Sequence, residues 1–161
     1  MKVQDLVKEL EDSIDYKTFK SKEVESFFAA GFFILNLKDK SESIQLDFFL
    51  PSKNKIAAFE FPFGEPKIFD EEIKQMKFQT TDIKIDIDDL EQVCKRTIKE
   101  NNSLIVPTKI IAILKDSEWN LTCMDDMLGI VRIKHDAITG KQIDFNKGSL
   151  MDFMGIKKKA S

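Results

Sequence analysis

Residues 107–145 read PTKIIAILKDSEWNLTCMDDMLGIVRIKHDAITGKQIDF, and this stretch decides the fold. Trp119, Leu121 and Cys123 alternate with polar residues, and this period of two predicts a strand with one apolar face. The uninterrupted apolar run at 110–114 predicts a strand that is central or covered on both faces. Residues 130–135 and 142–145 predict two more strands around a turn at 137–141. Because the links are short, the strands are expected to form antiparallel hairpins.

The chain before this stretch predicts helices followed by strands. Apolar residues at helical spacing predict an amphipathic helix over 3–14, and Ser21 is expected to cap a second helix that ends near Ala30. Three strands are expected after it, at 32–38, 44–50 and 55–61. Nine phenylalanines fall between residues 27 and 63, which indicates heavy burial or an interaction face. Residues 67–80 fit either a short helix or a covering loop.

A further helix is predicted over 88–101, with Asp88 as its N-cap and Glu91 completing a capping box. Residues 82–88 before it predict an edge strand or an extended lead-in. Residues 33–39 (FILNLKD) resemble residues 110–116 (IIAILKD), and each segment follows a helix and precedes two strands. Two related helix–β-meander halves would explain this echo, although helix-plus-hairpin units also look alike without being related.

These patterns predict an α+β fold with an antiparallel sheet of hairpins and helices packed on one face. The predicted divisions are 1–66, a connector at 67–81, a second helix–meander unit at 82–147 and a tail at 148–161; one compact domain is the alternative. Besides the phenylalanines, the expected core residues are Val93, Cys94, Ile98, Ile111, Ile113, Trp119 and Leu121.

The helix at 88–101 and the strands after it resemble a PepSY-type domain. The resemblance is carried by the amphipathic helix, the aromatic strand EWNL at 118–121 and the sequence IKHDAITGKQI at 133–143. PepSY domains commonly end in an extended strand followed by Asp-Ala-x-Thr-Gly and then Glu or Lys. The likeness covers about residues 82–147. It implies a small α+β module that regulates or inhibits peptidases or acts as a binding domain, and it carries over no catalytic residue.

Composition narrows the class of partner and the compartment. The chain has 25 basic and 28 acidic residues, a formal net charge of −3, so nucleic-acid binding is not expected. No apolar run reaches the roughly 20 residues of a membrane span, and no secretory signal is recognisable, so a cytoplasmic location is expected. Cys94 and Cys123 are then expected to be buried, reduced thiols that approach each other, with a disulfide as the alternative.

Few residues are candidates for chemistry. His135 is the single histidine and is expected at the surface or lining the hairpin, and a pocket at Arg132, His135 and Asp136 is the alternative. The acidic residues at 82, 86, 88 and 89 lack the glycine of a calcium loop and predict a solvated acidic edge. No metal and no cofactor is expected.

The C-terminal tail is the first candidate for partner binding. It joins a Met-rich apolar segment to three lysines, a composition that suits a partner groove or an anionic membrane surface. The alternative, which the sequence favours, is a final helical turn that packs on the chain's own sheet. The candidate residues are Leu150, Met151, Phe153, Met154, Ile156, Lys157, Lys158 and Lys159.

The sequence therefore predicts a non-catalytic, PepSY-like binding or regulatory module with a protein partner, and it allows a homodimer. The alternative is a small-molecule-binding protein or an enzyme with a cystatin-like pocket between helix and sheet.

Overall fold

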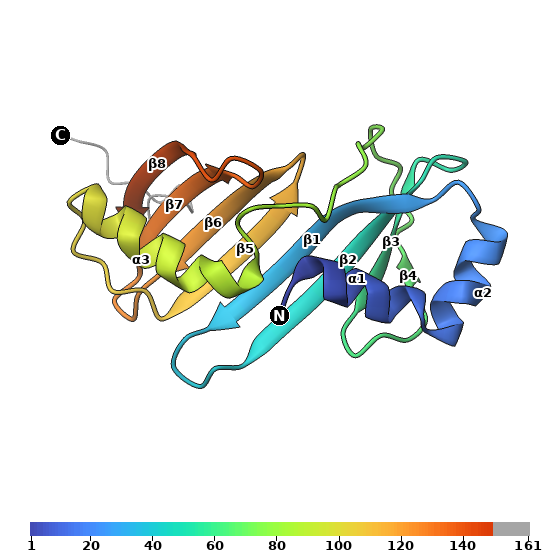
Figure 1. Cartoon of the computed structure of the whole chain (residues 1–161), viewed down its shortest axis with the longest axis horizontal. Helices are drawn as coiled ribbons and strands as arrows, with labels where there is room; N and C mark the ends of the chain where they lie inside the picture. Colours follow the sequence, from blue (N-terminus) through green and yellow to red (C-terminus); the bar gives the residue numbers. More distant parts are fainter. Residues whose placement is uncertain (150–161) are drawn as a thin grey trace.

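The computed structural model describes residues 1–149. Within them, eight strands form one antiparallel sheet in the order β4-β3-β2-β1-β5-β6-β7-β8, and the helices lie on one of its faces (Figure 1). The first half contains α1 (Val3–Glu11), α2 (Ile14–Lys22), β1 (Phe27–Asn36), β2 (Glu42–Leu50), β3 (Lys55–Glu60) and β4 (Lys67–Ile68). The second half contains the 3-10 turn η1 (Ile87–Asp89), α3 (Leu90–Glu100), β5 (Lys109–Lys115), β6 (Glu118–Met124), β7 (Gly129–Asp136) and β8 (Gln142–Ser149). The predicted α+β class with an antiparallel sheet is confirmed.

The two halves meet where β1 pairs with β5. The antiparallel register runs from Ala30 opposite Lys115 to Asn36 opposite Lys109. The sequence echo aligns Ile34 with Ile111, and these two residues lie directly opposite each other across the seam. From the seam, β2, β3 and β4 follow outward on one side, and β6, β7 and β8 follow on the other. Each half therefore contributes four consecutive strands to the one sheet.

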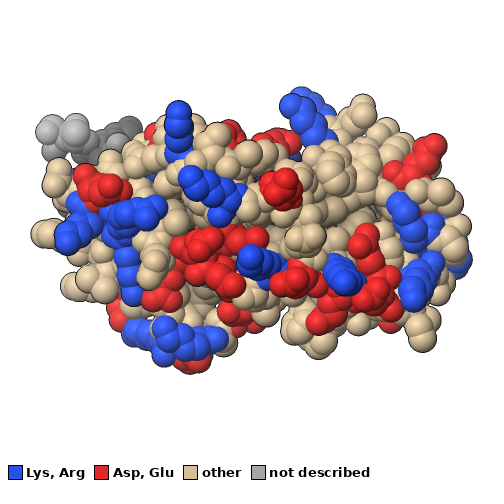
Figure 2. All heavy atoms as spheres, viewed as in Figure 1, with Lys and Arg blue, Asp and Glu red and all other residues tan. Residues whose placement is uncertain are grey.

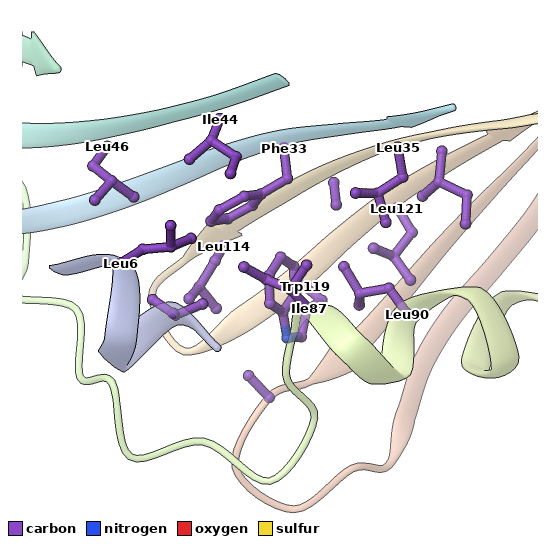
Figure 3. Packing of buried hydrophobic residues seen from close by; sticks show 14 of the residues in the cluster. Leu6, Phe33, Leu35, Ile44, Leu46, Ile87, Leu90, Leu114, Trp119 and Leu121 are labelled. Atoms are coloured by element: carbon purple, nitrogen blue, oxygen red, sulfur yellow. The ribbon is translucent and has the colours of Figure 1, made fainter. Parts of the chain in front are cut away.

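The core lies between the sheet and the helices and extends across both halves. Trp119 is fully buried beneath α3, its ring centroid is 5.7 Å from that of Phe33 in β1, and its Nε1–H donates to the Ile85 carbonyl at 2.8 Å. Figure 3 shows Leu6 of α1 and Leu90 of α3 converging on this centre. Buried residues of both halves belong to one cluster, so the halves share one hydrophobic core. Each fully buried side chain of this size contributes about 1.5–3 kcal/mol to the stability of the fold.

The N-terminal helices differ from the prediction. The helix predicted over 3–14 ends at Glu11, because Ser13 caps a new helix by accepting a hydrogen bond from the Tyr16 N–H at 3.1 Å. The helix predicted from Ser21 to Ala30 is wrong, since β1 already begins at Phe27. A strand suits this segment because both of its faces are buried: Phe28 joins the helix-side core and Ala29 packs on the opposite face.

Aromatic packing fixes α2 to the first meander. The rings of Tyr16 and Phe19 contact those of Phe48 in β2 and Phe59 in β3, with centroids between 5.2 and 6.4 Å apart. Of the predicted phenylalanine cluster, Phe48 and Phe59 therefore pack against α2, whereas Phe49 belongs to a cluster on the opposite face and Phe61 is partly exposed.

The N-terminus of α3 is capped two residues earlier than predicted. The capping box is made by Asp86 and Asp89 instead of Asp88 and Glu91, and Asp86 is the N-cap of the 3-10 turn η1 that leads directly into α3. The Asp86 carboxylate accepts hydrogen bonds from the Ile87 N–H at 2.9 Å and the Val3 N–H at 2.8 Å. This single side chain therefore joins the start of α1 to the start of α3.

The segment after β4 is a covering loop. Ile73 and Met76 pack on a small second cluster made by Ala29, Phe49 and Ile56, on the side of the sheet opposite the helices. The loop then returns along the end of the sheet, where the Gln79 N–H donates to the Phe28 carbonyl at 2.8 Å. It thus covers one end of the second face and leaves the middle of that face to other side chains.

Replacing Trp119 by Phe should lower the free energy of unfolding by about 2–4 kcal/mol, because it leaves a cavity and an unpaired Ile85 carbonyl. Urea unfolding followed by circular dichroism measures this change. Phe78→Leu, at an exposed ring, is the control and should change stability by less than about 0.5 kcal/mol. Equal effects of the two substitutions would contradict a core centred on Trp119.

Candidate binding surface

An apolar strip lies across the seam on the face of the sheet opposite the helices. In β5, Ile110, Ala112 and Leu114 belong to the helix-side core, so the alternate residues Ile111 and Ile113 point to the opposite face. The strip also includes two β1 residues that pair with them, and its members are Phe32, Ile34, Ile111 and Ile113. Three of these side chains are half-buried and Ile34 is 36% exposed.

Placing Ile111 and Ile113 in the core was therefore wrong. β5 is central, as predicted, but its second apolar face belongs to neither buried cluster of the described residues. The continuous apolar run in β5 reflects one face packed in the core and one face left accessible. We call the strip and its polar flanks the open face.

On one flank, the open face forms a hollow of about 470 Å³ over β5 to β8. Its floor at the seam is apolar, and polar side chains from β6, β7 and β8 surround it. The apolar floor includes Ile113. The polar side chains around it are Asn120, Thr122, Arg132, Lys134, Asp144 and Asn146. The register aligns them in cross-strand rows, for example Ile113, Asn120, Lys134 and Asp144. Lys134 also pairs with Glu118, its Nζ lying 3.8 Å from Oε1.

On the other flank, β2 places polar residues beside the strip. Gln45 lies opposite Phe32 and Ser43 lies opposite Ile34. The Gln45 Nε2–H donates to Asp47 Oδ1 at 2.8 Å. Asp47 is buried between Ala30 and Ala58, and this burial raises the pKa of its carboxyl to about 6, against the lowering effect of the Gln45 hydrogen bond. The apolar centre thus has polar groups on both sides.

The three residues of the predicted pocket point to three different places. Arg132 lines the hollow on the open face. His135 is buried on the helix side, where its Nε2 lies 3.1 Å from Thr97 Oγ1 of α3 and its Nδ1 lies 3.3 Å from the Gly140 carbonyl. Asp136 stabilises the turn, because its carboxylate accepts hydrogen bonds from the N–H groups of Ile138 and Thr139. These residues do not form one site.

The environment of His135 gives it a structural role. Burial lowers the pKa of the imidazole, although the hydrogen bond to the Gly140 carbonyl opposes this shift. A neutral ring has one donor and one acceptor, which suits its two partners. The expected surface position is wrong, because His135 is buried where it joins the hairpin to α3.

The remaining sequence predictions concern the C-terminal tail, metal binding and membrane spans. The eight tail residues, Leu150 to Lys159, lie outside the described residues. Across residues 1–149, no group of three or more His, Cys, Asp or Glu side chains could hold a metal ion. No helix in this part of the chain is long and apolar enough to cross a membrane.

The helix-bearing face has a different character. Figure 2 shows Lys and Arg interspersed with Asp and Glu over this face, as on an ordinary solvated surface. The sequence offered the phenylalanine-rich strands as an interaction face, but it placed Ile111 and Ile113 in the core, because the apolar run at 110–114 was interpreted as central or covered on both faces. The usable signal was that β1 and β5 both carry large apolar residues at alternate positions as well as at core positions.

Comparison with known proteins bears on the fold alone. No family model matches the chain, and no curated protein matches it. A crystal structure described as that of a putative lipoprotein (CD1622) from Clostridium difficile 630 is similar, with a TM-score of 0.50 and 13% sequence identity over 83% of this chain and 90% of that chain. The matched share of 83% is larger than either half of the chain, so the similarity in fold includes parts of both halves.

Replacing Asp47 by Asn should stabilise the protein at neutral pH. The carboxyl has an ordinary pKa of 3.8 and a folded value of about 6, so the folded state binds the proton more tightly. The stability that this protonation contributes is complete below about pH 4 and is lost as the pH rises through 6. Asp47→Asn should therefore raise the free energy of unfolding by about 1–3 kcal/mol at pH 7.5 and change it little at pH 4.

Urea unfolding at both pH values measures this difference. Glu60→Gln, at an exposed position on β3, is the control and should show the same small effect at both. An Asp47→Asn variant that is less stable at pH 7.5 would contradict the burial of an uncompensated carboxylate.

Proposed function

We propose that the chain is a non-catalytic protein-binding or regulatory module of the PepSY-like type, and that it binds a folded protein partner on its open face. The observation that carries this proposal is the strip of Phe32, Ile34, Ile111 and Ile113, which stays accessible in the middle of the sheet. Large apolar side chains at the centre of a sheet are stabilised when another surface covers them.

The surroundings of the strip favour a protein as the partner. An apolar centre with a hydrogen-bonding rim is the usual anatomy of a protein interface. The rim offers amides and hydroxyls at Asn120, Thr122 and Gln45, together with charges of both signs at Arg132, Lys134 and Asp144. A mixed rim of this kind suits a protein surface better than a nucleic-acid backbone, which would require a basic excess.

Asp47 adds a second argument. Its buried carboxyl lowers the stability of the isolated chain at neutral pH, and it lies on the open face next to the strip. Residues that lower stability where a neutral residue would fit are often retained for binding.

Two features support the PepSY-like description. The second half has the order of one helix followed by an antiparallel meander, which is the order that the sequence resemblance implies. The space between α3 and the sheet is filled by core side chains such as Val93, Ile98 and Leu121, which favours a binding module over an internal pocket. The cytoplasmic location and the homodimer expected from the sequence stay predictions.

The test compares matched variants of the full chain as affinity baits in native extract of the source organism. Ile34→Thr with Ile111→Thr makes the strip polar while keeping β-branched residues in the strands. Ile14→Thr with Val24→Thr is the control, because these hydrophobic residues are exposed elsewhere. Mass spectrometry quantifies the captured proteins, and binding is then measured with the purified partner.

The proposal expects one protein, in stoichiometric amount, that the wild type and the control bind at least tenfold more tightly than the strip variant. A version ending at Ser149 should still bind it. Equal capture by the wild type, the strip variant and the control, or no specific capture by any of them, would contradict the proposal. Loss of binding only in the shortened version would assign the interaction to residues 150–161 instead, and self-association abolished by the strip variant would make the partner a second copy.

A further inference from the structure

A pair of buried thiols joins α3 to the sheet. Cys94 lies on the apolar stripe of α3, Cys123 lies in β6, and both are fully buried. Their Sγ atoms are 2.8 Å apart, and 29 positions separate them in the sequence. Both are free cysteines in this structure.

The two sulfur atoms are already close to bonding distance. A disulfide bond is about 2.05 Å long, so the gap to close is less than about 1 Å. The two residues belong to rigid elements that face each other across the core, so the arrangement is set by the packing of α3 on β6 rather than by a mobile loop. Cys123 lies opposite Ile110 and Val131 in its neighbouring strands. These apolar side chains cannot form a bond to sulfur, so each cysteine faces the other as its bonding partner.

We propose that Cys94 and Cys123 form a disulfide that closes only while the chain folds or while α3 is detached, with a small or protein disulfide as the oxidant. In the first step, a thiolate of one cysteine attacks the oxidant and releases one thiol. In the second step, the other cysteine attacks the mixed disulfide and releases the second thiol. The pair loses two electrons and two protons, and the oxidant is reduced to two thiols.

Burial explains why the step requires an open state. The oxidant cannot reach a fully buried sulfur, and the core has no room for a mixed disulfide. The hydrogen bond to Cys123 and burial also raise the pKa of the Cys94 thiol, so little reactive thiolate is present in the folded chain. A chain that folds with reduced thiols is therefore kinetically protected, and the state of the pair records the redox conditions under which the chain folded.

The test expresses the full chain in two compartments, the bacterial cytoplasm and, behind a cleavable signal peptide, the bacterial periplasm. Both samples are denatured, alkylated with iodoacetamide and weighed by mass spectrometry. The cytoplasmic chain should take up two alkyl groups. The exported chain should take up none until it is reduced, and its melting temperature should be about 5–15 °C higher, because the new bond constrains the unfolded chain.

A second measurement tests the requirement for an open state. The folded, reduced chain is exposed to oxidised glutathione, with and without a urea concentration near the unfolding midpoint. Oxidation should be about 100-fold slower without urea. Two alkylatable thiols in the exported chain, or separate glutathione adducts on the two cysteines, would overturn the proposal. Fast oxidation of the folded chain would overturn the requirement for opening.

Discussion

The pairing of β1 with β5 is the constraint on which the rest of the structure depends. It joins the four strands of each half into one sheet and brings Phe33, Leu114 and Trp119 into a common core. It also protects two strands that would otherwise be exposed edges rich in apolar residues and open to aggregation. The same pairing places Ile34 opposite Ile111 and so creates the strip on the other face. Stability and the proposed binding surface thus arise from one set of backbone hydrogen bonds.

The local features of the second half could be predicted because short-range rules decide them. The alternation around Trp119 predicts the strand that is observed as β6. The Ala-Ile-Thr-Gly turn predicts the hairpin that is observed after β7. The first half was harder to predict, because Phe27 to Ala30 are compatible with either a helix or a strand. Only the long-range contacts of Phe28 with the core and of Ala29 with the covering loop decide for the strand. The Asp86 carboxylate also bonds a distant group, the Val3 N–H, which no local pattern around Asp86 could reveal.

The part of the candidate site that lies on β5 could not be predicted, for a similar reason. An uninterrupted run of apolar residues does not say whether its second face is covered by the same chain or left accessible. In this chain the loop at 69–80 covers Phe49 and Ile56 but not the middle of the sheet. Arg132, His135 and Asp136 are neighbours in sequence, yet strand alternation and the turn separate them in space. The proximity of Cys94 and Cys123, by contrast, followed correctly from placing both on inward faces.

Site-directed photo-crosslinking from the strip tests the binding account most directly. A benzophenone side chain introduced at Ile111 reports what lies over the open face inside the cell, and the same group at Ile14 reports background contacts. The account predicts that position 111 is linked to one partner protein in high yield and that position 14 is not. Links from position 111 only to the chain's own residues 150–161, or yields no higher than at position 14, would contradict a protein-binding role for the open face.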